Sequence, residues 1–334
     1  MDFAKTYRTC KMSRALARGL PAVLECLERQ RATYISVEDA TVDVFSPIHG
    51  YRVTTLDGTA FFPKNVLEVR KDSGLVWMRE GLSTADVVLP PYYALGDVSR
   101  WTSLIISAKG HDGRMKAGDA MLMEMYPFDA IAKLVIGVWS KRKTFDLFHD
   151  QLVESAKAYG LGLYGVAIVG LLPCVEGIIR KLGVLAGISV RDAVSIHTLI
   201  RVFKHLQRNE LAHMFDGFDW YPPSEINVGL LDGFHERVQM LESIATYLNS
   251  KLYLHTDSAP EYLTLNRNGI AHGFFHGYAT QANYLRLFNL LSSLSFAAIL
   301  VEGSGSMMFP RATAESDVLN ASLIKCSAMK SMLN

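Results

Sequence analysis

Apolar residues follow two different periods along this chain. Between residues 34 and 98, short runs rich in β-branched and aromatic residues are separated by turn signals such as Asp57-Gly58 and Ser73-Gly74, which is typical of strands and hairpins. The expected β-type runs are residues 34–45, 51–58, 65–74 and 75–80. Pro90-Pro91 and a loop expected at 109–114 interrupt this strand-like pattern. The sequence therefore predicts a small β-rich segment.

Helical spacing governs the rest of the chain. Residues 12–31 predict one amphipathic helix, weakened in its middle by Gly19 and Pro21. After about residue 120, six further helices are expected, at 124–140, 143–158, 160–182, 192–215, 226–250 and 280–301. Because each apolar face must be buried against another helix, these segments predict a bundle.

The predicted fold class is α+β overall, with an all-α helical bundle after a smaller N-terminal β-rich domain. The expected parts are an N-terminal helix plus β-rich domain at 1–120, the bundle at 125–305 and a C-terminal tail at 306–334. We expect the N-terminal domain to act as a sensor or to position a substrate.

Composition narrows the class of protein without naming a partner. Hydrophobic residues make up 49% of the chain and charged residues 20%, which favours a packed globular protein over a disordered one. The formal net charge of +1 gives no overall attraction to phosphate. RNA binding would need a local basic patch, for which Arg201, Lys204, Arg208 and the Lys-Arg-Lys triplet at 141–143 are the candidates.

The four cysteines and one uncharged apolar segment indicate where in the cell the protein is expected to be. Cys10, Cys26, Cys174 and Cys326 are scattered without zinc-type spacing, so a reduced cytoplasmic setting is expected. Residues 158–175 carry no formal charge and reach the lower limit for a spanning helix. Their glycines and the proline at 173 favour a buried helix of the bundle, and no membrane partner is expected.

Two separated segments carry a family resemblance. Residues 265–273 read LNRNGIAHG and are followed by an apolar helix, and residues 171–182 read LLPCVEGIIRKL. In this order they resemble bacterial proteins of the HEPN superfamily, over about residues 130–302. The resemblance implies a helical bundle, commonly dimeric, in which an Arg-x(4–6)-His signature marks a metal-independent endoribonuclease. It also implies a toxin or antiviral-defence setting, with an antitoxin or activator protein as a further partner.

Carried over by position, the signature falls on Arg267 and His272, which the resemblance implies to be catalytic. Asn268 stands at the polar position after the arginine, where many relatives have histidine, and Glu176 matches a glutamate of the upstream helix. His276 is a supporting candidate, because it follows His272 by four residues and would share its face of a continuing helix. No third metal ligand is close in the sequence, so we expect neither metal nor cofactor.

The bare spacing is not specific, because the chain contains it at least four times. Arg208, Asn209 and His213 form the strongest alternative, since Asn again follows the arginine. Arg267 is preferred because only it has the longer family context on both sides.

The chemistry of RNA cleavage suits this pair of residue types. Histidine can act as base or acid near neutral pH, and arginine grips phosphate oxygens with two donors. The product would be a 2′,3′-cyclic phosphate. A helix is expected to begin at Asn266 or Asn268, with His272 in its first turns. Five residues of separation place the two side chains about 140° apart on a helix, so a twofold dimer sharing the Arg267/His272 site is expected.

The alternative is a non-catalytic helical module that binds a protein partner or a nucleotide. The two hypotheses differ in whether Arg267 and His272 line an open cleft or are satisfied inside the bundle. The RNA target and its sequence preference are not encoded in any motif of the chain.

Overall fold

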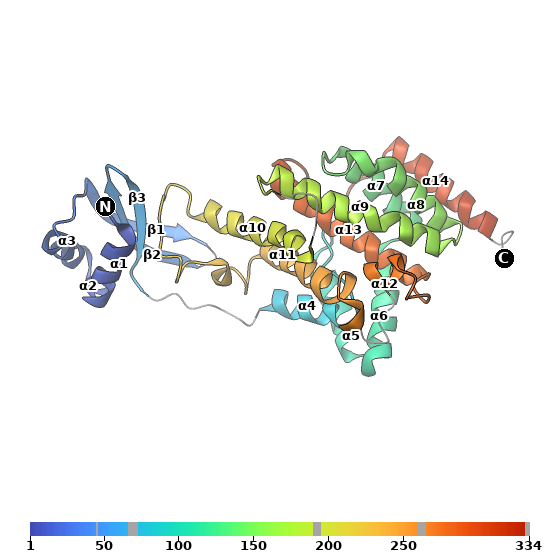
Figure 1. Ribbon diagram of the computed structural model, residues 1–334, viewed down its shortest axis with the longest axis horizontal. Coiled ribbons are helices and arrows are strands. Elements are labelled where there is room, and N and C mark those ends of the chain that lie inside the picture. Colours follow the sequence, from blue (N-terminus) through green and yellow to red (C-terminus); the bar gives the residue numbers. More distant parts are fainter. Residues whose placement is uncertain (45, 66–72, 190–194, 259–264, 331–334) are drawn as a thin grey trace. The chain divides into compact units, whose positions relative to one another are not determined.

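A computed structural model of the chain divides into two compact units (Figure 1). It describes residues 1–44, 46–65, 73–189, 195–258 and 265–330. Unit 1 comprises Met1–Val76 and Gln207–Val238, and unit 2 comprises Trp77–Leu206 and Gln239–Asn334. The predicted boundary at 120–125 is therefore wrong, because unit 1 is completed by a segment that returns to it after residue 206.

Unit 1 combines three short helices with one small sheet. Its elements are α1 (Phe3–Met12), α2 (Ala15–Arg18), α3 (Leu20–Arg29), β1 (Ser36–Asp43), β2 (Pro47–Thr55), β3 (Gly58–Pro63) and the 3-10 helix η3 (Val228–Leu230). The single helix expected at 12–31 is wrong. Gly19 has a φ of 105°, so the chain turns there and starts a new helix at Leu20.

The sheet is an antiparallel meander in the order β1-β2-β3. The expected turn at Asp57-Gly58 is confirmed, since it joins β2 to β3 and Gly58 has a φ of 143°. Pairing places Tyr51 opposite Phe62 and Val53 opposite Ala60, and these four side chains form one core with α1–α3.

Segment 207–238 packs against strand residues whose side chains point away from α1–α3. Phe61 packs with Leu211 and Phe215 in a second core, because successive side chains of a strand point to opposite faces. The Phe61 amide also donates to the carbonyl of Trp220 at 2.8 Å. Segment 207–238 therefore belongs to unit 1 by packing and by backbone hydrogen bonds.

Unit 2 is helical throughout its described residues, apart from turns and connections. Its elements, some shared at the unit boundaries, are α4 (Gly74–Ser83), α5 (Leu95–Ser107), α6 (Gly110–Met125), α7 (Phe128–Gly137), η1 (Trp139–Lys141), η2 (Asp146–Phe148), α8 (His149–Gly160), α9 (Tyr164–Leu185), α10 (Ile196–Met214), α11 (Glu236–Tyr247), the π-helix η4 (Leu248–Leu252), η5 (Thr256–Ser258), α12 (Arg267–Ala271), α13 (Gln281–Glu302) and α14 (Ala314–Met329). The protein is α+β overall, mostly helical with one three-stranded sheet.

Three expectations for unit 2 are wrong. The strand predicted at 75–80 is helix α4, in which Met78 and Leu82 share a buried helical face. The loop predicted at 109–114 starts α6. The tail predicted at 306–334 contains α14, which packs on α7 and α8 through Leu319 and Leu323. The strand predicted at 65–74 falls mostly outside the described residues.

The helices expected at 143–158, 160–182 and 280–301 are confirmed as α8, α9 and α13. The apolar run 158–175 is not one helix, because it spans the end of α8, a turn with Gly162 at φ 79°, and the first half of α9. Within the described residues, α13 is the helix long and apolar enough to cross a membrane, and 89% of its apolar window is buried inside the protein. That burial is typical of a core helix.

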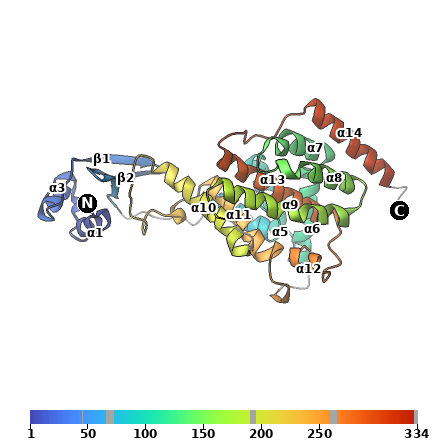
Figure 2. The ribbon, with the colours of Figure 1, turned by 45° about the horizontal axis from the view of Figure 1, so that its top comes forward.

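Helix α13 is the centre of unit 2. It is buried at every position from Ala282 to Ile299, and it packs along α9 and against α6 (Figure 2). Its polar side chains hold the irregular buried segment 85–89, whose carbonyls have no helical partner. Asn289 donates to the Val88 carbonyl at 2.7 Å, and Ser293 donates to the Leu89 carbonyl at 3.3 Å.

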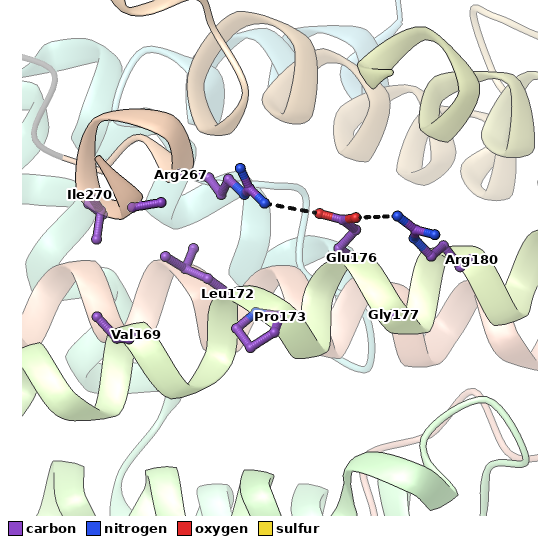
Figure 3. Close-up of a pocket in the computed structure, with 9 residues that line it drawn as sticks. Val169, Leu172, Pro173, Glu176, Gly177, Arg180, Arg267 and Ile270 are labelled. Atoms are coloured by element: carbon purple, nitrogen blue, oxygen red, sulfur yellow. Dashed lines mark hydrogen bonds and ion pairs between the residues drawn. The ribbon is translucent and has the colours of Figure 1, made fainter. Parts of the chain in front are cut away.

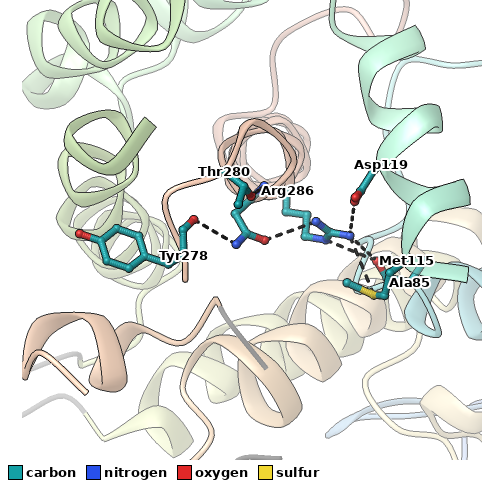
Figure 4. A network of polar contacts seen from close by, with 7 residues as sticks. Ala85, Met115, Asp119, Tyr278, Thr280 and Arg286 are labelled. Carbon is teal, nitrogen blue, oxygen red and sulfur yellow. Dashed lines mark hydrogen bonds and ion pairs between the residues drawn. The ribbon is translucent and has the colours of Figure 1, made fainter. Parts of the chain in front are cut away.

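Arg286 is the charged member of this polar stripe (Figure 4). Its guanidinium is 2.6 Å from a carboxylate oxygen of Asp119 on α6 and 3.2 Å from the Ala85 carbonyl. A third contact, at 3.3 Å, reaches Asn283, whose amide donates to the Tyr278 carbonyl. Arg286 is 3% exposed, so the network joins α6, segment 85–89 and the turn before α13 inside the core.

We expect Asp119→Asn to destabilise unit 2 by about 3 kcal/mol, because it leaves a buried guanidinium without its counter-charge. Chemical denaturation followed by far-UV circular dichroism measures the loss. Glu25→Gln is the matched control, since Glu25 pairs with Arg29 on an exposed face of α3 and should cost less than about 1 kcal/mol. Equal effects of the two changes would show that the buried network does not stabilise the bundle.

Candidate functional site

Asn266 fixes the start of the helix that carries Arg267. Its side chain is fully buried, and its Nδ2 donates to the carbonyls of Lys251 at 3.0 Å and Leu254 at 2.8 Å. Its Oδ1 accepts from the Gly269 amide at 2.8 Å and so caps α12. The N-cap predicted from the sequence is confirmed at Asn266. The two bonds donated by Nδ2 tie α12 to the end of η4 and the turn that follows it.

Helix α12 ends after one turn. Gly269 admits the ring of Phe275, which lies 2.6 Å from where a Cβ would be, and Gly273 takes a φ of 73°. His272 is therefore the C-cap of a five-residue helix. The expected position of His272 in the first turns of a longer helix is wrong, and His276 does not share its helix face because the helix stops before it.

Arg267 lies in a group of three charged side chains from two helices (Figure 3). Its Nη2 is 3.7 Å from Oε2 of Glu176 on α9, and its Nη1 donates to the Asn268 side chain at 3.3 Å. Arg180, one turn further along α9, donates to Oε1 of Glu176 at 2.7 Å. The closer pair is thus Glu176–Arg180, and the Arg267 side chain, which is 38% exposed, has the longer contact with Glu176.

These charges border an open pocket of about 580 Å³ between α9 and α12. Its remaining walls are apolar and include Val169, Leu172, Pro173, Ile270 and Ala271 (Figure 3). An apolar floor with charged groups at one end is typical of a site for a ligand that has a flat apolar part and an anionic part.

A buried phenol lies beside the same charges. Burial raises the pKa of Tyr253, and the Glu176 carboxylate raises it further against the opposing effect of Arg267 and Arg180. Its hydroxyl therefore stays protonated at neutral pH. Among the described residues this buried hydroxyl has no hydrogen-bond partner, and Tyr253 is not one of the residues that line the pocket.

His272 does not line this pocket. The side chain is exposed, and within the described part of the chain its ring has only a loose contact with the ring of Phe274, at 6.3 Å between centroids. From the helical rise, the Cα atoms of Arg267 and His272 are roughly 8 Å apart. One protomer therefore presents the two side chains on different sides of α12.

The alternative motif lies in unit 1, on the last turns of α10. Arg208 and His213 are exposed there and Asn209 is half-buried. Glu210, inside the motif, is buried and lies 3.3 Å from Arg237. The two motifs thus belong to different compact units.

The six candidates for the basic patch differ in their exposure. Arg142 is 7% exposed and pairs with the equally buried Glu302. Lys204 pairs with Glu242. Arg142 is therefore not open to RNA. The Lys204 side chain is 42% exposed despite its ion pair, and the other four candidates are exposed: Lys141, Lys143, Arg201 and Arg208. No group of three or more potential metal ligands occurs among the described residues.

The sequence interpretation did not single out Arg180 and Tyr253. Arg180 had a detectable signal, because it follows Glu176 by four residues on a strongly apolar helix and so shares its face. Tyr253 had none, since it reaches the site only through the fold.

Comparison with protein-family models, curated proteins and solved structures found no match. The function must therefore be argued from the residues and their arrangement.

We expect Asn266→Ala to destabilise unit 2 by about 3 kcal/mol, because it removes a helix cap and leaves two buried carbonyls without donors. Asn266→Asp is the matched variant, since it keeps the capping oxygen and loses the two donated bonds. Denaturant unfolding would measure both. An alanine variant as stable as the wild type would show that α12 is not held by this side chain.

Proposed function

We propose that the chain is a metal-independent endoribonuclease of HEPN type, with Arg267 and His272 as its catalytic residues. The observation that carries the proposal is that both side chains are accessible at the two ends of one short, rigidly capped helix, and that Arg267 borders an open pocket. Neither side chain is buried inside the bundle.

The chemistry assigns a role to each group. The Arg267 guanidinium binds non-bridging oxygens of the scissile phosphate and stabilises the charge that develops on them. An imidazole removes the proton of the 2′-hydroxyl, and an imidazolium protonates the leaving 5′-oxygen. The products are a 2′,3′-cyclic phosphate and a 5′-hydroxyl.

In the proposed mechanism, a homodimer brings an Arg267 and a His272 side chain to the same phosphate. Arg267 and His272 face different sides of α12. The RNA whose phosphate is bound by Arg267 of one copy therefore exchanges protons with His272 of a second copy. Apolar side chains surround the pocket on α9 and after α12: Val166 is 65% exposed, Val169 48% and Phe274 66%. A second copy would cover this apolar surface.

Glu176 has a positioning role in this proposal. Its carboxylate holds Arg180 and partly neutralises Arg267 in the absence of RNA. Because the Arg267 contact is longer than a hydrogen bond, a phosphate with two parallel acceptors competes for that guanidinium. Asn268 orients the other side of Arg267 through its 3.3 Å contact. His276, exposed in the following loop, is a candidate RNA contact.

The setting follows from the resemblance alone. It supports a cytoplasmic toxin or antiviral-defence enzyme that is restrained or switched on by an antitoxin or activator protein. Unit 1 would then be the sensor or the substrate-positioning module.

The second candidate function is nucleotide binding without catalysis. The pocket favours it, because its apolar walls and the two guanidiniums suit a base and a phosphate without any need for His272. In that case Arg180 would matter as much as Arg267, and His272 would not matter.

We expect purified protein to cleave a labelled mixed-sequence RNA with EDTA present. Arg267→Ala and His272→Ala should each slow cleavage by roughly 100-fold or more, because each removes a group that acts in the transition state. Gel separation with end-group analysis measures the rate and identifies the cyclic phosphate.

The matched controls are Arg208→Ala and His213→Ala, which alter the same residue types at the same spacing in the other unit. Activity lost only in these two would move the site to α10. Absence of cleavage by all variants, together with nucleoside monophosphate binding that needs Arg180 and Arg267 but not His272, would favour the binding function.

Mixing the inactive Arg267→Ala and His272→Ala proteins should restore cleavage. In a mixed dimer one site receives Arg267 from one copy and His272 from the other, so activity should rise well above either variant alone. Cleavage that stays at background, while size analysis shows that mixed dimers form, would mean that both residues act within one protomer.

A further inference from the structure

Two cysteines that are 16 residues apart in the sequence meet inside unit 1. Cys10 on α1 and Cys26 on α3 have their sulfur atoms 3.1 Å apart, and both side chains are buried, Cys10 completely. They sit in the core that the helices share with Tyr51 and Phe62 of the sheet. The sequence spacing gave no sign of this pair.

Polar donors surround the two sulfurs in this otherwise apolar core. The Gln30 amide lies 3.3 Å from the Cys26 sulfur and 3.8 Å from that of Cys10. The Ser13 hydroxyl is 3.6 Å from the Cys26 sulfur. The Ser13 hydroxyl donates to the Cys10 carbonyl at 3.1 Å, so the donors that reach the Cys26 sulfur are the Gln30 amide and the Cys10 thiol.

The two thiols are therefore not equivalent. Burial, together with hydrogen bonding to Cys26, raises the pKa of the Cys10 thiol to about 12, so Cys10 remains protonated. Cys26 is also the one with residual exposure, at 7%. Because Cys26 is the more exposed of the two, its sulfur meets a small oxidant first.

We infer that Cys10 and Cys26 form an oxidation site, a dithiol that hydrogen peroxide converts into an intramolecular disulfide. The Cys26 sulfur attacks one peroxide oxygen, the O–O bond breaks, and Cys26 sulfenic acid and one water are formed. The Cys10 sulfur then attacks the Cys26 sulfur, and its proton leaves with the hydroxyl as a second water. Two thiols lose two hydrogens and two electrons, and the peroxide is reduced to water.

The change needs little movement. A disulfide has its sulfurs about 2.05 Å apart, so they must approach by only about 1 Å from their present separation. The bond would join α1 to α3 across α2 and restrict the unfolded chain between them. Oxidised unit 1 is therefore expected to unfold at a higher temperature than reduced unit 1.

The other two cysteines serve as internal controls. Burial raises the pKa of Cys174 to about 12, and its thiol donates to the Gly170 carbonyl within α9. Cys326 lies on α14 and is partly exposed. Neither has a second sulfur in contact among the described residues.

The test treats the full-length protein with a small excess of hydrogen peroxide, then denatures it and alkylates the remaining thiols. Intact mass and non-reducing peptide mapping should show two of the four thiols lost and a Cys10–Cys26 cross-linked peptide. Reduction with a dithiol reagent should reverse it. Cys10→Ser should halt the reaction at Cys26 sulfenic acid, which a cyclic diketone traps, and Cys26→Ser should abolish both products.

The double variant Cys174→Ser/Cys326→Ser should form the cross-link at the wild-type rate and show the same rise in unfolding temperature. Oxidation of Cys326 or intermolecular cross-linking while Cys10 and Cys26 stay alkylatable in the wild type would overturn the inference. The wild-type peptide map decides this even if a serine variant fails to fold.

Discussion

Unit 2 depends on the burial of a helix that is not purely apolar. Helix α13 passes through the core, and its Asn289, Ser293 and Arg286 side chains point at the carbonyls of segment 85–89. A buried carbonyl without a donor costs about as much free energy as a lost hydrogen bond. The irregular segment can therefore be buried only because α13 supplies these donors, and α13 can carry polar groups only because the segment accepts from them.

The same principle sets the candidate site. Asn266 satisfies two carbonyls at the end of the π-helix and caps α12 with its oxygen, so one buried amide decides where Arg267 emerges. Helix α12 then ends after one turn, which separates Arg267 from His272. The division of the two groups is a consequence of backbone geometry and is what makes a second copy part of the proposed mechanism.

The polar groups of the two units lie in different surroundings. In unit 2, the Glu176 carboxylate lies between the Arg180 and Arg267 guanidiniums at the edge of a pocket, where the proposed RNA phosphate would compete for Arg267. In unit 1, the Gln30 amide donates to the Cys26 sulfur inside an apolar core, where no charged partner is present among the described contacts of that sulfur. The first arrangement suits anion binding and the second suits thiol chemistry.

The sequence by itself determined the helices α8, α9 and α13, the hairpin at Asp57-Gly58 and the cap at Asn266, because each depends on local periodicity or on a local hydrogen bond. It also placed Glu176 and Arg267 in one site through a resemblance. Only the tertiary structure decided the rest. Residues 207–238 complete unit 1 through pairing with β3, Cys10 meets Cys26 across two helices, and His272 ends a helix because Phe275 packs on Gly269. These contacts join residues whose neighbours in space are set by packing, and packing leaves no periodic signal in the chain.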